Sequence, residues 1–226
     1  MDLFNDQKNV TNVDSFDCLD ENNKPKEFDE NVMDLVFILD KSGSMCGAVE
    51  DTIGGFNSYI EKERAKLEDE NILVTLILFD TQYNVLYSRK PIDEVEKLTR
   101  EQYFASGCTA LLDAIGRTIV SLDREVNNKV LFVITTDGLE NASRKFSKDQ
   151  VKELIQSHEW EFLFIGADID SYAEAYTLGI DEDHAANYEK SSAGLGSLFT
   201  SVGNYRYRYA RDEHTRGGSD WKEGLD

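Results

Sequence analysis

The sequence predicts an α/β fold: a doubly wound, mostly parallel six-stranded sheet with one antiparallel edge strand and helices on both faces. Two observations predict it. Short runs of Val, Ile, Leu and Phe recur along the chain, and segments whose apolar residues have helical spacing separate them. This alternation of strands and helices is typical of a parallel sheet whose right-handed crossovers place helices on its two faces.

The first half of the chain supplies three of the expected strands. The apolar run Met33–Leu39 ends at a Gly/Ser turn and is expected to be a buried parallel strand. A helix should follow over residues 49–70, and residues 71–79 form the second strong strand. A very short loop then leads to a strand at 83–87, and so short a connection forces an antiparallel pairing.

The second half alternates in the same way. The expected elements are a short helix (91–98), a small-residue loop (105–110), a helix (111–122), a strand (130–136), a helix from 147 to about 158 with Ser147 as N-cap, a strand (160–166), a helix (171–178), a short strand (184–189) and a helix from 191 to about 205. The segment Tyr205–Tyr209 alternates aromatic and basic residues, a pattern that also suits stacking on nucleic acid. Because the chain is so acidic, we favour a helix end or an ordered tail that packs against the acidic body.

Length and composition indicate one domain with two extensions. At 226 residues and 40% hydrophobic content, the chain can bury one substantial core. We assign residues 1–31 to an acidic, flexible N-terminal arm, 32–205 to the folded domain and 206–226 to a C-terminal tail. Within the tail, residues 216–226 are rich in Gly and charge and are expected to be disordered.

Charge and cysteine content narrow the classes of partner and compartment. A formal net charge of -20 repels phosphate backbones and anionic membranes, so we expect neither nucleic acid nor membrane as a partner. No signal peptide or membrane-spanning run is visible, and a cytoplasmic location is expected. The cysteines and histidines show no disulfide or zinc-ligand spacing: Cys18, Cys46, Cys108, His158, His184 and His214.

Oxygen-bearing side chains follow three of the predicted strands. Asp40, Ser42 and Ser44 come directly after the first strand, Thr109 lies in the small-residue loop, and Asp137 follows the strand at 130–136. Ser, Gly and Asp also dominate ordinary turns, so the first loop alone is ambiguous. In a doubly wound sheet, however, the carboxyl ends of neighbouring central strands face one crevice. Five oxygen ligands from three loops are suited to a hard cation such as Mg²⁺.

These motifs resemble the von Willebrand factor type A domain over roughly residues 32–205, and in particular its stand-alone bacterial branch. The family's metal-ion-dependent adhesion site combines Asp-x-Ser-x-Ser with a Thr and an Asp from two further loops. Here the first part reads Asp40-Lys41-Ser42-Gly43-Ser44, and the other two residues are Thr109 and Asp137. The bacterial branch is suggested by Thr136-Asp137-Gly138-Leu139-Glu140-Asn141-Ala142-Ser143 and by Phe164-Ile165-Gly166-Ala167-Asp168.

The resemblance implies an intact metal site and a binding function. Asp40, Ser42, Ser44, Thr109 and Asp137 would hold Mg²⁺, with Mn²⁺ or Ca²⁺ as alternatives. The open coordination position would accept an Asp or Glu from a protein partner. By analogy, the chain could act in a stress-response system or beside an AAA+ ATPase.

Two other functions are compatible with parts of this pattern. A Mg²⁺-dependent phosphohydrolase or phosphotransferase also places Asp at the end of a first strand, but the second Asp of the haloacid-dehalogenase type is Ser42 here, and no phosphate-binding Gly-Lys loop is present. A scaffold that no longer uses its metal is disfavoured by the complete set of five residues. We therefore expect a binding module and not an enzyme.

Three further residue types near the loops have two interpretations each. Cys46 and Cys108 suit a redox-sensitive pair, although small buried packing cysteines are more common. Asp80 either supports the site from behind or forms a hairpin turn, and Lys41 either screens the acidic rim or is solvated. The acidic surface also suggests a partner with basic residues around the carboxylate that it supplies.

Overall fold

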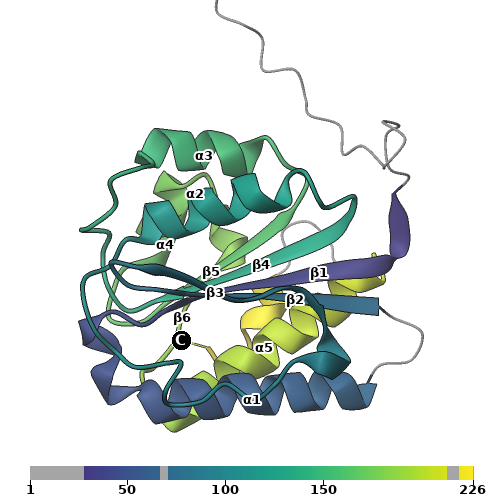
Figure 1. Ribbon diagram of the computed structural model, residues 1–226, viewed down its shortest axis with the longest axis horizontal. Coiled ribbons are helices and arrows are strands. Elements are labelled where there is room, and N and C mark those ends of the chain that lie inside the picture. Colours follow the sequence, from purple (N-terminus) through teal and green to yellow (C-terminus); the bar gives the residue numbers. More distant parts are fainter. Residues whose placement is uncertain (1–27, 67–70, 213–218, 226) are drawn as a thin grey trace, which may run out of the picture.

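The computed structural model describes residues 28–66, 71–212 and 219–225, which form one six-stranded sheet between two layers of helices (Figure 1). The strand order is β3-β2-β1-β4-β5-β6, and only β3 runs antiparallel to its neighbour. The strands are β1 (Asp29–Asp40), β2 (Asn71–Phe79), β3 (Tyr83–Pro91), β4 (Asn128–Thr136), β5 (Glu161–Gly166) and β6 (Ala185–Asn187). The predicted fold class is confirmed.

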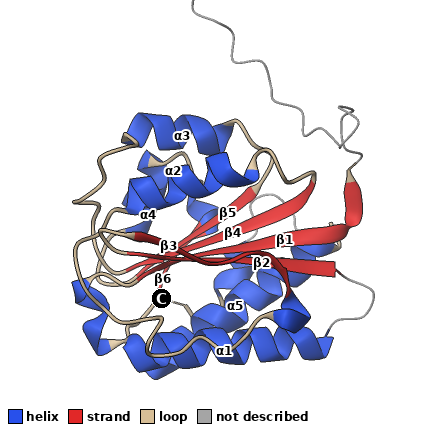
Figure 2. Cartoon of the chain, viewed as in Figure 1, coloured by secondary structure: helices blue, strands red, loops and turns tan. Residues whose placement is uncertain are grey.

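The helices divide between the two faces of the sheet (Figure 2). Helices α1 and α5 cover one face, and α2, α3 and α4 cover the other (Figure 1). Their bounds are α1 (Val49–Lys66), α2 (Leu111–Leu122), α3 (Lys148–Gln156), α4 (Ser171–Thr177) and α5 (Ser192–Ala210). No described helix is both long enough and apolar enough to cross a membrane.

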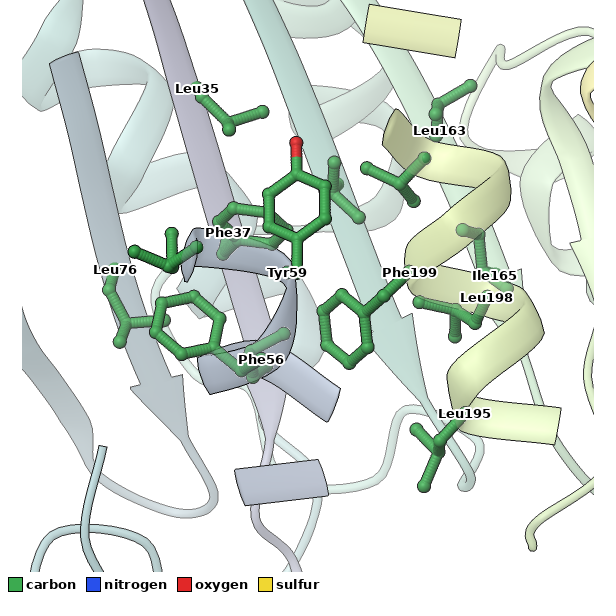
Figure 3. Close-up of a cluster of buried hydrophobic side chains, with 14 of the residues drawn as sticks. Leu35, Phe37, Phe56, Tyr59, Leu76, Leu163, Ile165, Leu195, Leu198 and Phe199 are labelled. Carbon is green, nitrogen blue, oxygen red and sulfur yellow. The ribbon is translucent and has the colours of Figure 1, made fainter. Parts of the chain in front are cut away.

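Alternation along β1 supplies apolar side chains to both layers. Leu35 and Phe37 belong to the core beneath α1 and α5, whereas Val36 and Ile38 belong to the core beneath the other three helices. On the first face, the Phe37 ring meets the edge of Phe56 from α1, with centroids 5.4 Å apart and an interplanar angle of 89° (Figure 3). Burial on both faces explains why the strand reads as a continuous apolar run.

Several helices and strands lie where local sequence patterns predicted them. The expected strand at 71–79 and helix at 111–122 coincide with β2 and α2. Ser147 is the N-cap of α3, as predicted, and forms a capping box in which its hydroxyl accepts from the backbone N–H of Gln150 while the Gln150 side chain accepts from the backbone of Ser147. Helix α5, expected to end near Tyr205, continues to Ala210.

The helix expected at 91–98 is wrong. Only one 3₁₀ turn forms, η2 (Ile92–Glu94), and the chain is extended at Val95. Side chains of α1 instead bind backbone groups of this segment. The Arg64 guanidinium donates to the carbonyls of Ile92 and Val95, and the Asn57 amide bonds both the N–H and the carbonyl of Leu98 at 2.7 and 2.9 Å. Tertiary hydrogen bonds therefore outweigh the helical spacing of the apolar residues.

The ends of the chain differ from expectation where they are described. Disorder over 216–226 is wrong for residues 219–225, because a 3₁₀ turn, η4 (Ser219–Lys222), places Trp221 at 1% exposure. The Trp221 indole donates to the carbonyl of Asp183 at 2.8 Å and packs on Tyr205. Residues 1–27, most of the expected N-terminal arm, lie outside the described part of the chain.

Candidate metal site

The candidate site lies where the sheet's connections change direction, at the carboxyl ends of β1 and β4. These strands are parallel neighbours, with Leu39 opposite Thr135, yet the chain visits β2 and β3 between them. Asp40 is the last residue of β1, and Asp137 directly follows β4. This is the switch point at which open α/β sheets bind ligands.

Asp40 is fully buried and held by two donors. The backbone N–H of Ser42 donates to its Oδ1 and the hydroxyl of Thr136 to its Oδ2, both at 2.6 Å. Burial raises the pKa of Asp40 and the charge of Asp137 adds to this, although the hydrogen bonds from Thr136 and Ser42 act in the opposite direction. Thr136, at the end of β4, therefore orients Asp40 across the switch point.

A chain of oxygens connects three of the predicted ligands. The Ser42 and Ser44 hydroxyl oxygens are 3.0 Å apart, and the Ser44 hydroxyl donates to Oδ1 of Asp137 at 2.5 Å. The loop after β1 therefore faces the loop after β4 through its hydroxyl groups, which are neutral oxygen donors.

Thr109 reaches the same place from the loop before α2. Its backbone N–H donates to the Asn141 side chain and its carbonyl accepts from the Asn141 N–H, both at 3.0 Å. A Cβ added at Gly138 would lie 3.0 Å from the Thr109 hydroxyl oxygen and 3.6 Å from that of Ser44. The absence of a side chain at Gly138 therefore leaves space next to both hydroxyl oxygens. Of the five residues that the sequence predicts as ligands, Ser42, Ser44 and Asp137 are linked through their side-chain oxygens, and Thr109 lies beside Gly138 with Ser44. Asp40 contacts the backbone of Ser42 and the hydroxyl of Thr136.

The donor set fits a hard cation and not a transition metal with nitrogen or sulfur ligands. Within the described ranges, no group of three or more His, Cys, Asp or Glu side chains is placed to hold a metal ion, so an ion here would depend on the hydroxyl ligands. The Tyr188 hydroxyl, among the described residues, is buried without a hydrogen-bond partner. Burial raises its pKa, and so do the nearby charges of Asp137 and Asp40. The Tyr188 hydroxyl is thus a buried polar group without a hydrogen-bond partner in the described part of the chain, and its pKa responds to the charges of Asp137 and Asp40.

Sequence analysis missed Lys190, which lies between β6 and α5. Its ammonium group is 2.8 Å from Oδ2 of Asp137, 2.9 Å from a carboxylate oxygen of Asp168 and 3.4 Å from the carbonyl oxygen of Ser44. The hydrogen bond to Asp137 raises the pKa of Lys190, and the one to Asp168 adds to the effect against partial desolvation. No local pattern marks this lysine. Thr136, in contrast, is a hydroxyl residue directly before Asp137 and was detectable.

A buried ion pair supports the first loop from behind. Lys41 is 1% exposed and pairs with Asp80, so of its two interpretations the solvated lysine is wrong. Asp80 has both of its expected roles: it accepts from the N–H of Gln82 in the hairpin turn at 2.5 Å and from the Ser106 hydroxyl at 3.0 Å. The Ser106 N–H also donates to the carbonyl of Lys41. These contacts tie the loop after β1 to the loop that carries Thr109.

The two described cysteines are free thiols. Cys46 and Cys108 are both exposed, so their interpretation as buried packing residues is wrong. The aromatic and basic segment at the end of α5 does pack on the body, as favoured. Tyr205 and Tyr209 are buried, and Arg206 pairs with Glu63 of α1 at 2.6 Å.

Comparison with known proteins identifies the fold. No family profile and no curated protein sequence matches the chain. Among solved structures, proximal thread matrix protein 1 from the mussel byssus, with a zinc-occupied MIDAS motif, has a TM-score of 0.59 and 15% identity, over 77% of this chain and 45% of that one. The vWF domain of a type V pili tip protein from Porphyromonas gingivalis has a TM-score of 0.55 and 10% identity, over 76% and 95% of the two chains.

A third structure extends the comparison. The pilus adhesin SpaC from Lactobacillus rhamnosus GG, in its open conformation, has a TM-score of 0.62 and 14% identity, over 80% of this chain and 30% of the adhesin. The chain thus spans less than half the length of the mussel protein and of this adhesin. Similarity at these identities shows the fold, which is that of a von Willebrand factor type A domain.

Proposed function

We propose that the chain is a metal-dependent protein-binding module that holds a divalent cation, Mg²⁺ first, with Mn²⁺ or Ca²⁺ as alternatives. The ligands would be Asp40, Ser42, Ser44, Thr109 and Asp137, and the partner would be a protein that supplies an Asp or Glu side chain. The observation that carries the proposal is the convergence of hydroxyl and carboxylate oxygens from three loops at the switch point, with the Ser42 and Ser44 oxygens 3.0 Å apart and Ser44 bonded to Asp137.

The charge of the ligand set supports recruitment of an acid. Three of the five residues contribute neutral hydroxyl oxygens to the metal. The ligand set therefore carries at most two negative charges, which do not exceed the charge of a divalent ion. Asp40 is already engaged by Ser42 and Thr136 and would act partly through those hydrogen bonds. The bound ion would supply a positively charged position for a carboxylate from another molecule. The chain's own part is to hold the hydroxyls and Asp137 around that position.

The described residues do not support a catalytic function. His158 pairs with Asp123, and His184 pairs with Glu161, both at contacts of 2.8–2.9 Å that do not involve the candidate ligands. A phosphohydrolase would need a nucleophile with a base or orienting group beside it. A link to a stress-response system or an AAA+ ATPase, and a cytoplasmic location, stay predictions.

Calorimetric titration of Mg²⁺, Mn²⁺ and Ca²⁺ into the full chain tests the metal site. We expect wild type to bind the ions. Thr109→Val and Asp137→Asn should bind them at least about tenfold more weakly, because each substitution removes a protein ligand and a water molecule is a poorer substitute for it. Asp93→Asn, an exposed acidic residue outside the site, is the matched control for charge. Equal affinity in wild type and Asp137→Asn would contradict the proposal.

Capture of partners from a lysate then tests the binding function. The protein retained by wild type in Mg²⁺ should be lost in chelator and lost with Asp137→Asn, and it should be released by free carboxylate in excess. A partner retained equally with Mg²⁺ and with chelator would instead support a scaffold that does not use the metal.

A further inference from the structure

The candidate ligand Asp137 already has a cation beside it. Its side chain is 0% exposed, and the Lys190 ammonium group lies 2.8 Å from Oδ2, on the oxygen that Ser44 leaves free. A buried carboxylate without a counter-charge is strongly disfavoured, so this contact stabilises the loop after β4 in the protein without metal.

Lys190 also has a second carboxylate within reach. Asp168, after β5, is 2.9 Å from the ammonium group and is 65% exposed on its side chain, whereas the lysine side chain is 23% exposed. Asp168 takes a left-handed φ of 55°, a conformation that Asp adopts more readily than most residues other than glycine. The ammonium group can therefore leave Asp137 and keep one ion pair at the rim.

We infer that Lys190 is a built-in counter-ion that competes with the divalent metal for Asp137 and thereby sets the metal concentration at which the site fills. The inference rests on the proposed function. A divalent ion next to Asp137 and an ammonium group 2.8 Å from the same carboxylate would repel each other in a partly buried place. Metal binding then has to displace the Lys190 ammonium group from Asp137 toward Asp168. This displacement makes the free energy of metal binding less favourable.

Metal titration of charge variants tests the competition. Lys190→Gln should bind Mg²⁺ and Mn²⁺ about tenfold more tightly than wild type, because one nearby like charge is removed. Lys190→Arg keeps the charge and should stay close to wild type. The matched control is Lys97→Gln, which removes a lysine that is 71% exposed and pairs with Glu61 on α1, and it should leave the affinity unchanged.

Stability gives a second readout that does not depend on metal affinity alone. In chelator, Lys190→Gln should unfold at lower urea than wild type, because Asp137 loses its counter-charge. At saturating Mg²⁺ the difference should vanish or reverse, because the ion replaces the lysine and the tighter site adds more stability. A lysine with a purely structural role would cause the same loss under both conditions.

The outcomes separate the two proposals. If wild type binds metal and Lys190→Gln binds it equally or more weakly, the competition is overturned and the metal site stands. If none of the proteins binds metal, the proposed function is overturned and the competition with it. Tighter binding by Lys190→Gln and by Lys97→Gln alike would show a general effect of net charge and would also overturn the competition.

Discussion

At the scale of single residues, the buried carboxylate of Asp34 is held by donors from two other strands. Asp34, on β1, is fully buried, and Arg89 of β3 binds both of its oxygens at 2.9 and 3.0 Å. Asn128 of β4 adds a third donor at 2.9 Å. Arg89 has a left-handed φ of 47°, beside the irregular register between β2 and β3, and this bend directs the guanidinium across β2.

Removal of this guanidinium should be costly. Arg89→Met leaves the Asp34 carboxylate buried without its cation, and we expect a loss of about 3–5 kcal/mol in the free energy of unfolding, measured with urea. The double variant Arg89→Met/Asp34→Leu should recover most of that loss, since no buried charge is left unpaired. Metal affinity should not change, because neither residue contacts the candidate site. A single variant as stable as wild type would show that the pair contributes nothing.

At the scale of elements, the loop between Asp137 and α3 is organised by two acidic side chains, Glu140 of the loop itself and Asp113 of α2. The Glu140 carboxylate accepts from the N–H of Leu112 at the start of α2 and from the N–H groups of Ala142 and Ser143. The helix dipole favours a negative charge at that position. The loop begins at Asp137, and its residue Asn141 binds the backbone of Thr109. The same loop therefore contains one candidate ligand and contacts a second.

Asp113 of α2 holds the far part of this loop and should make stability depend on pH. Partial burial by itself raises its pKa, but hydrogen bonds from the N–H groups of Arg144, Lys145 and Phe146 outweigh it and leave the pKa below the ordinary 3.8. A lowered folded-state pKa contributes stability above the unfolded-state pKa, and that contribution disappears as pH falls through the folded value.

The test compares urea unfolding of wild type and Asp113→Asn across pH. Wild type should be more stable at pH 7, and the difference should shrink as the pH falls below about 4, where the wild-type carboxyl also becomes neutral. Asp93→Asn serves as the exposed control. A difference that stays constant down to the acid limit would mean that the charge of Asp113 does not contribute.

Two adjacent glycines of α1 should respond in opposite directions to alanine. A Cβ at Gly55 would lie 2.6 Å from the ring of Phe199 on α5, whereas a Cβ at Gly54 meets nothing within 4 Å. Gly54→Ala should stabilise the protein by about 0.5–1 kcal/mol through helix propensity. Gly55→Ala gains the same propensity but forces α1 and α5 apart, and a net loss of about 1–3 kcal/mol is expected in urea unfolding. Equal effects at both positions would show that α5 does not pack as closely as described.

At the scale of the whole molecule, the net charge of -20 bears on association and not on the fold. A partner that brings a carboxylate into this field is expected to carry basic residues around it. Its association rate, measured by stopped flow with Mg²⁺ present, should fall as added salt shortens the screening length from about 10 Å to about 3 Å. A rate that is flat or rises with salt would contradict a basic partner surface.

The sequence alone determined the sheet, most of the helices and the five candidate ligands. Continuous apolar runs predict buried parallel strands because both faces of each strand are covered, and Asp40 and Asp137 are detectable because each directly follows such a run. The capping box at Ser147 is equally local. The strands, the helices and the cap depend on residues within a few positions of one another. The set of five candidate ligands instead combines three separate loops, and it was assigned through the family resemblance.

Only the tertiary structure decided the remaining features. Lys190 meets Asp137 across 53 positions of sequence, Arg64 and Asn57 of α1 bind the backbone of the segment expected to be helical at 91–98, and Trp221 packs the turn at 219–222 against the body. Each depends on a side chain from a distant element that competes with, or replaces, the local preference of the backbone. Such contacts exist only once the layers have packed, which is why the counter-ion of the candidate metal site left no pattern in the sequence.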